Sequence, residues 1–115
     1  MAQPYFITTP IYYVNDRPHI GHAYTTLACD VLARFKRLDG FDVTFLTGTD
    51  EHGQKVEKAA SDKGLSPQSF TDEVSQNFRD LTAQMNFSNN DFIRTTEVRH
   101  KLACQEIWNR LQTLG

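Results

Sequence analysis

The sequence is poor in cysteine, in net positive charge and in long apolar runs. Only two of its 115 residues are cysteines, Cys29 and Cys104, and they lie far apart. Because they form no CxxC pair, neither a disulfide framework nor a cysteine zinc site is predicted. We expect both side chains to be small packing groups on helices of a protein in a reducing compartment.

Charge and hydropathy exclude further classes of protein. The chain has 12 Lys and Arg against 14 Asp and Glu, a formal net charge of -2, so no general basic surface for nucleic acid is predicted. No run approaches the roughly 20 apolar residues that cross a membrane. Residues 1–4 lead into a strand-like segment without the regions of a signal peptide. We expect a cytoplasmic protein that does not contact a membrane.

Strand-like and helical patterns alternate along the chain, which is typical of an α/β fold with a parallel sheet. In chain order we expect a strand over 5–9, a helix over 21–39, a strand over 42–46, helices over 51–63 and from 67 onward, a strand over 91–94, and a last helix capped by Thr95 or Thr96. Two clear strands and a weak third leave the sheet with unpaired edges. The pattern therefore indicates a fragment of a larger domain.

Apolar stripes predict which helix faces enter the core. The stripe of the first helix is Leu27, Val31, Phe35 and Leu38. Its opposite face should be solvated, a simpler interpretation than a nucleic-acid patch, and carries Asp30, Arg34, Lys36 and Arg37. The stripe of the third helix is Phe70, Val74, Phe78, Leu81 and Met85. The stripe of the last helix is Ile107, Trp108, Leu111 and Leu114.

Residues 18–22, PHIGH, lie where the first strand gives way to the first helix. Gly21 has no Cβ and lets a ligand approach the backbone. A helix that begins here presents free N–H groups and the positive end of its dipole, which favours phosphate. The imidazoles of His19 and His22 can donate hydrogen bonds to phosphoryl oxygens. The stretch predicts a nucleotide phosphate site.

Two loops should flank this site at the carboxyl ends of parallel strands, where ligands bind in such sheets. Residues 11–18 form the first loop, and its Tyr12 and Tyr13 either line a pocket or cap the core. Residues 47–50 form the second loop, beside the first if the crossover is right-handed. This places Asp50, Glu51 and His52 in the same crevice as the two histidines. Asp50 either binds a substrate ammonium or caps the next helix.

Residues 19–22 resemble the HIGH signature of class I aminoacyl-tRNA synthetases and match all four of its letters. The flanking segments sharpen the resemblance. Residues 8–15, TTPIYYVN, and 47–53, TGTDEHG, look like the methionyl-tRNA synthetase family, and the similarity extends from about residue 5 to the end. A bare HxGH would be weak, because related nucleotidyltransferases share it.

The resemblance implies the first half of a Rossmann-like (HUP-type) nucleotide-binding fold, with helices flanking a parallel sheet. Residues 1–115 would be the N-terminal half of the catalytic domain, without the second half, the connective insertion or the anticodon-binding domain. The full protein would activate methionine with ATP to methionyl-adenylate and transfer it to tRNA(Met), which it would contact mostly outside this segment. The family's second signature, KMSKS, is absent, so the isolated chain should be inactive.

Family resemblance also implies roles for individual residues. The catalytic pair would be His19 and His22. The ATP-binding residues would be Tyr12, His19, Gly21 and His22. The methionine-binding residues would be Pro10, Ile11, Tyr13 and Asp50. Mg²⁺ would arrive with ATP, held by its phosphates. No zinc is expected in this segment, because no cysteine lies near the histidines and a helix N-terminus repels cations.

Two other functions remain open from the residues. The chain could be a nucleotide-binding or interaction module that kept HIGH and lost catalysis, in which case the reading frame would stop near Gly115. It could also be a nucleotidyltransferase that uses HxGH with another acceptor. The methionine-type flanks of the HIGH residues disfavour the second of these.

Overall fold

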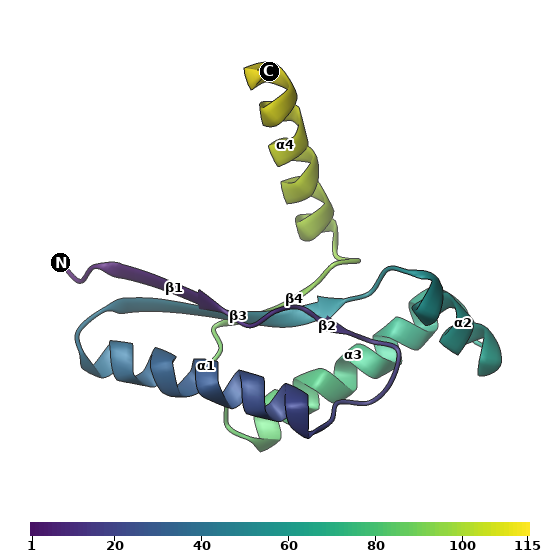
Figure 1. The fold of residues 1–115 in the computed structure, drawn as a ribbon, viewed down its shortest axis with the longest axis horizontal. Helices are drawn as coiled ribbons and strands as arrows, with labels where there is room; N and C mark the ends of the chain where they lie inside the picture. Colours follow the sequence, from purple (N-terminus) through teal and green to yellow (C-terminus); the bar gives the residue numbers. More distant parts are fainter.

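The structure is a computed structural model that describes all 115 residues. Four strands and four helices follow one another along the chain (Figure 1). In order they are β1 (Pro4–Thr8), β2 (Tyr12–Tyr13), α1 (Ile20–Leu38), β3 (Asp42–Asp50), α2 (Gln54–Asp62), α3 (Pro67–Gln84), β4 (Asp91–Arg94) and α4 (Val98–Leu114). The predicted α/β class and the parallel sheet are confirmed, because every strand pair is parallel.

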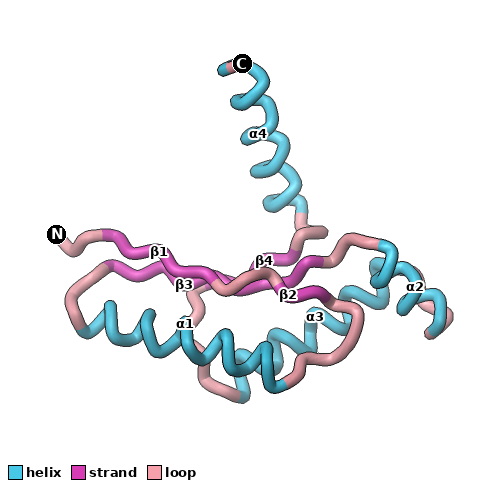
Figure 2. Tube along the Cα trace, viewed as in Figure 1, coloured by secondary structure: helices cyan, strands magenta, loops and turns pink.

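The centre of the sheet is β3, and all other strands pair with it (Figure 2). Thr8 pairs with Leu46 and Tyr12 with Thr49, so β1 and β2 form one interrupted edge strand. In the interruption, residues 9–11 face only residues 47–48, a one-residue bulge at Pro10, which has no N–H to donate. The opposite edge of β3 carries β4, since Leu46 and Thr49 also pair with Asp91 and Arg94.

The loop predicted over 47–50 was wrong, because β3 continues to Asp50. Gly48 explains the error. A Cβ on Gly48 would lie 2.0 Å from the carbonyl oxygen of Ile93, so β4 can pair at this distance only with glycine there. The flanking β-branched Thr47 and Thr49 are fully compatible with a strand. A glycine that suggested a turn is instead the point of closest approach between two strands.

Helices α1 and α3 cover the same face of the sheet, whereas α4 projects from the opposite side (Figure 1). Between helices and sheet lie two apolar clusters. The larger joins β2, α2, α3 and β4 and contains Tyr12, Val14, Val56, Ala60, Phe70, Val74, Phe78 and Phe92. The smaller joins α1 to β3 and contains Ala33, Val43 and Phe45, with Cys29 packed against it. None of the four helices has the length and hydropathy of a membrane-spanning segment.

The predicted orientation of α1 was wrong. Val31 and Phe35 of its apolar stripe are 59% and 56% exposed, and the buried residues of the helix are Thr26, Asp30 and Ala33. Asp30 is buried because its carboxylate accepts hydrogen bonds from the Ser88 backbone N–H at 2.6 Å, and from the Ser88 hydroxyl and Arg34. The charged face of α1 therefore binds the turn before β4.

The other helices agree with the sequence in part. Phe70, Val74 and Phe78 of α3 are buried as predicted. The predicted apolar face of α4 was wrong, because this helix buries no residue and Trp108 is 65% exposed. Cys104 on α4 is likewise exposed rather than packed. Apolar faces of α1 and α4 are thus left uncovered within these 115 residues.

The outward face of α1 gives a direct test. Replacing Val31 with Lys and Phe35 with Glu together should leave the far-ultraviolet circular dichroism of the 115-residue chain unchanged and reduce its aggregation, because neither side chain is buried. Ala33→Lys is the control on the same helix, and it should abolish helical signal, since Ala33 is fully buried. Loss of helix in the double variant would show that the stripe does face the core.

Candidate functional site

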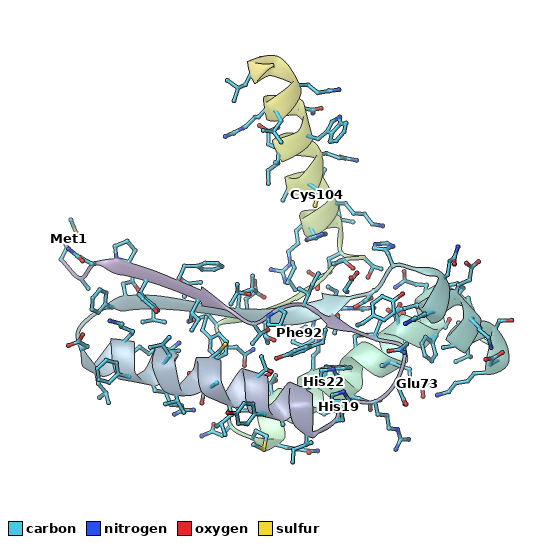
Figure 3. The ribbon with its side chains drawn as sticks, viewed as in Figure 1. Met1, His19, His22, Glu73, Phe92 and Cys104 are labelled. Carbon is cyan, nitrogen blue, oxygen red and sulfur yellow. The ribbon has the colours of Figure 1, made fainter.

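The amino-terminal end of α1 is built by two histidines that cap each other's backbone. His19 is the N-cap, and its Nδ1 accepts a hydrogen bond from the Gly21 N–H at 3.0 Å. In return, Nδ1 of His22 accepts from the His19 N–H, also at 3.0 Å. This arrangement is a capping box in which imidazoles replace the usual hydroxyl and carboxylate. The two side chains lie together below the sheet and beside α3 (Figure 3).

The capping bonds fix the tautomer of both neutral rings. A nitrogen that accepts from a backbone N–H carries no hydrogen, so each ring holds its hydrogen on Nε2. Burial, and then the neighbouring His19, lower the pKa of His22, which keeps its ring neutral at pH 7. The ring centroids are 3.9 Å apart. Two Nε2–H donors are thus presented side by side at a helix N-terminus.

Gly21 is required by the capping geometry itself. A Cβ at this position would lie 2.8 Å from Cε1 of His19 and 3.0 Å from its Nδ1. The imidazole of His19 therefore lies against the backbone of Gly21, in the space that a Cβ would occupy. The glycine allows the first histidine to cap the helix. The approach of a ligand to the backbone at Gly21 stays a prediction.

Tyr12 and Phe78 form an aromatic wall behind His22. The Tyr12 ring meets His22 edge-on at 4.9 Å and stacks on Phe78 at 5.9 Å, while Phe78 lies 5.0 Å from His22. The Tyr12 hydroxyl shares a 2.7 Å hydrogen bond with the Thr26 hydroxyl. Burial raises the pKa of Tyr12 although the Thr26 bond opposes it. Tyr12 is a core residue that holds the histidine, and its contact with ATP stays a prediction.

The contact of Phe78 with His22 was not predicted from the sequence. The sequence shows Phe78 only as one position of the apolar stripe on α3. Its contact with His22 depends on how α3 lies against α1, and nothing local to residue 78 indicates that arrangement.

Asp50 ends β3 with its carboxylate free of any hydrogen bond or ion pair to the protein. Its backbone pairs with Tyr13 of β2. The N-cap of α2 is Gly53, without a side-chain capping bond, so the interpretation of Asp50 as a helix cap was wrong. Gly53 has φ +133, and a Cβ there would lie 2.2 Å from the Tyr13 hydroxyl. Tyr13 thus packs against the loop that follows Asp50.

Glu51, the next residue, does not face the crevice as predicted but is buried beneath it. Its carboxylate accepts hydrogen bonds from the Thr49 hydroxyl at 2.6 Å, from Arg94 at 2.7 and 2.8 Å, and from the Thr96 hydroxyl at 2.8 Å. Burial alone would raise the pKa of this carboxyl, but the bonds from Arg94 and the threonines outweigh it and the pKa is lowered. Since Arg94 lies 43 residues further along the chain, no local pattern could reveal the pair.

The remaining residues predicted for the site are His52, Pro10 and Ile11. His52 turns toward the β4–α4 connection, where its Nε2 is 3.3 Å from the Thr95 carbonyl oxygen. It is therefore not brought together with the HIGH histidines. Pro10 and Ile11 are exposed at the bulge between β1 and β2. A ligand could contact both residues there.

One short strand connects the two halves of the site. In β2, Tyr12 packs on His22, and the adjacent Tyr13 pairs with Asp50. Neutral hydrogen-bond donors for an anion and a free carboxylate for a cation therefore flank the same strand. Such an arrangement suits a ligand that carries phosphate at one end and an ammonium group at the other.

Comparison with known proteins shows the family to which the chain is related. A family model described as tRNA synthetases class I (M) matches residues 5–115. Methionine–tRNA ligase of Rickettsia typhi is 68% identical over the whole chain, which spans 23% of that relative. The ligase of Mesorhizobium japonicum is 53% identical over 98% of the chain and 22% of its own length.

A solved structure of Mycobacterium tuberculosis methionyl-tRNA synthetase in complex with methionyl-adenylate superposes with a TM-score of 0.93. It is 47% identical and covers 96% of this chain and 22% of its own. The chain thus corresponds to less than a quarter of its relatives' length. With the family model matching almost every residue, the chain belongs to the class I tRNA synthetases of the methionine type.

Proposed function

We propose that residues 1–115 are the amino-terminal half of the catalytic domain of a methionine–tRNA ligase. The whole protein would activate methionine with ATP and transfer it to tRNA(Met) in the cytoplasm, with the tRNA contacts mostly outside this segment. The observation that carries the proposal is the pair of Nε2–H donors at the N-terminus of α1, joined through β2 to the free carboxylate of Asp50. The superposition on a synthetase in complex with methionyl-adenylate supports it.

The first reaction needs positioning and charge stabilisation rather than a protein nucleophile. The methionine carboxylate attacks the α-phosphorus of ATP, a P–O bond breaks, and pyrophosphate leaves with the bonding electrons. Negative charge builds on the phosphoryl oxygens as this happens. His19 and His22 donate to those oxygens as neutral rings whose orientation is fixed before ATP binds, which is the condition for effective electrostatic catalysis.

Methionine would lie over the end of β3 and the bulge of the neighbouring edge strand. Asp50 would bind its ammonium group, since no cation of these 115 residues pairs with its carboxylate. Pro10, Ile11 and Tyr13 line the pocket for the thioether side chain; Ile11 is exposed and available for this contact. Apolar contacts with a few placed polar groups are typical of such sites.

ATP would occupy the side of the site formed by α1. Gly21 lets the nucleotide approach the helix backbone, and Tyr12 borders the same side behind His22. Mg²⁺ would bind chiefly to the phosphate oxygens of ATP, and this segment would hold no zinc. The chain lacks KMSKS, and without the remainder of the domain it would be inactive. The uncovered apolar faces of α1 and α4 support packing of further chain against it.

The histidines can be tested with a substitution that separates capping from catalysis. In His19→Asn of the full-length ligase, the amide oxygen replaces Nδ1 as the cap of Gly21, but no group replaces Nε2–H. We expect adenylate formation, measured by quenched flow, to slow by roughly 10²-fold or more, with the melting temperature nearly unchanged because Asn is a good N-cap.

His19→Ala is the matched control for that variant. It loses both groups, so it should be equally slow and also less stable. Adenylate formation at the wild-type rate in His19→Asn would remove the Nε2–H of His19 from the mechanism.

Asp50 can be tested through methionine affinity. Asp50→Asn in the full-length ligase loses the charge-assisted contact to the ammonium group, worth about ten- to a hundred-fold in binding. Calorimetry should show this weakening for methionine. The affinity for methioninol, which keeps the ammonium group but lacks the carboxylate, should fall by the same factor. ATP affinity and melting temperature should remain near wild type, because Asp50 makes no capping bond. Unchanged methionine affinity would refute the ligand role.

A further inference from the structure

A buried ion pair is formed by the residue next to Asp50, whose carboxylate is proposed to bind the substrate ammonium. The side chain of Glu51 is 0% exposed and that of Arg94 is 18% exposed. Arg94 donates hydrogen bonds to both carboxylate oxygens of Glu51, from Nε at 2.7 Å and from a terminal nitrogen at 2.8 Å. It also reaches Asp72 of α3 at 2.6 Å. The pair therefore joins the ends of β3 and β4 to a helix.

The bonds of this network hold the backbone on both sides of Asp50. The Thr49 hydroxyl donates to Glu51, and the Thr49 carbonyl accepts from the Thr95 N–H at 3.2 Å. After Asp50, the Glu51 N–H donates to the Thr95 hydroxyl at 2.8 Å. The residues before and after Asp50 are thus fixed to the β4–α4 connection, while the carboxylate of Asp50 itself is left free.

Stability alone gives a poor reason for such a pair. Desolvation offsets most of the attraction in a buried ion pair, and apolar replacements are often as stable. What a bidentate Arg–carboxylate pair supplies is a fixed geometry. Here that geometry is imposed on the residue next to the proposed ammonium ligand.

We propose that Glu51 and Arg94 are positioning residues that orient the Asp50 carboxylate toward the ammonium group of methionine. This inference rests on the proposed function of Asp50. It assigns no contact with substrate to Glu51 or Arg94. Their role is to prevent the end of β3 from rotating when the ligand binds or leaves.

The test compares Glu51→Gln and Arg94→Lys with wild type in the full-length ligase, using methionine-dependent pyrophosphate exchange below the lowest melting temperature. Both variants lose the bidentate charged pair. We expect the KM for methionine to rise about 10-fold or more, because a displaced Asp50 carboxylate loses its charge-assisted hydrogen bond to the ammonium group. The KM for ATP should stay within about twofold, because the capping box of α1 is untouched.

Asp30→Asn is the matched control for destabilisation. Asp30 is a buried carboxylate bound to Ser88 and Arg34, remote from the end of β3. It should lower the melting temperature and leave the KM for methionine unchanged. Should Glu51→Gln fail to fold, Thr96→Val removes a single bond to Glu51 and should raise the same constant by a smaller factor. Variants of Glu51, Arg94 or Thr96 that lose stability but keep the wild-type KM for methionine would overturn the inference.

Asp50→Asn measured in the same assay separates this inference from the proposed function. If Asp50→Asn and Glu51→Gln both raise the KM for methionine and their effects do not add, the positioning role is supported. If only Asp50→Asn raises it, the ligand role stands and the positioning role is refuted. If Asp50→Asn leaves it unchanged, the ligand role fails and the positioning role fails with it.

Discussion

The close pairing of β3 with β4 at Gly48 is the constraint on which the geometry at the end of β3 depends. Because no Cβ separates Gly48 from the Ile93 carbonyl, the two strands run together to Thr49 and Arg94. Their shared end brings Arg94 onto Glu51, and it brings Thr95 into hydrogen bonds with the backbone of Thr49 and Glu51, on both sides of Asp50. A larger residue at position 48 would force β3 and β4 apart. We expect the side chain of Asp50, two residues further along β3, to lose its orientation as a result.

The histidine pair at the start of α1 depends on other interactions, because each histidine uses both of its ring nitrogens. One ring nitrogen satisfies a backbone donor at the start of α1, and the other is left for a ligand. Capping thereby fixes the tautomer that the proposed contact with phosphate requires. Tyr12 connects the histidine pair to the end of β3, because it supports His22 from a strand whose next residue pairs with Asp50.

The sequence predicted the fold class and most elements, since these depend on local periodicity. It also predicted a role in phosphate binding for the HIGH residues, and that role stays a prediction. The predictions were wrong where a polar residue is buried or an apolar residue is exposed. Asp30 is buried because Ser88 and Arg34 satisfy it, whereas the apolar Val31 and Phe35 are uncovered. Periodicity assigns apolar faces to the core and cannot indicate that a chain lacks the element to cover one. The Glu51–Arg94 pair was equally hidden, because only the folded sheet brings the two residues together.

The most direct test of the preset histidines is long-range ¹⁵N–¹H NMR of the full-length ligase labelled at histidine, with the signals of His19 and His22 assigned by substitution. At neutral pH and without ligand, both rings should show a protonated Nε2 and an unprotonated Nδ1. Addition of ATP should then shift the Nε2 signals while the tautomer is retained. A hydrogen on Nδ1 of either free ring, or a change of tautomer on binding, would contradict the claim that helix capping prepares the phosphate site.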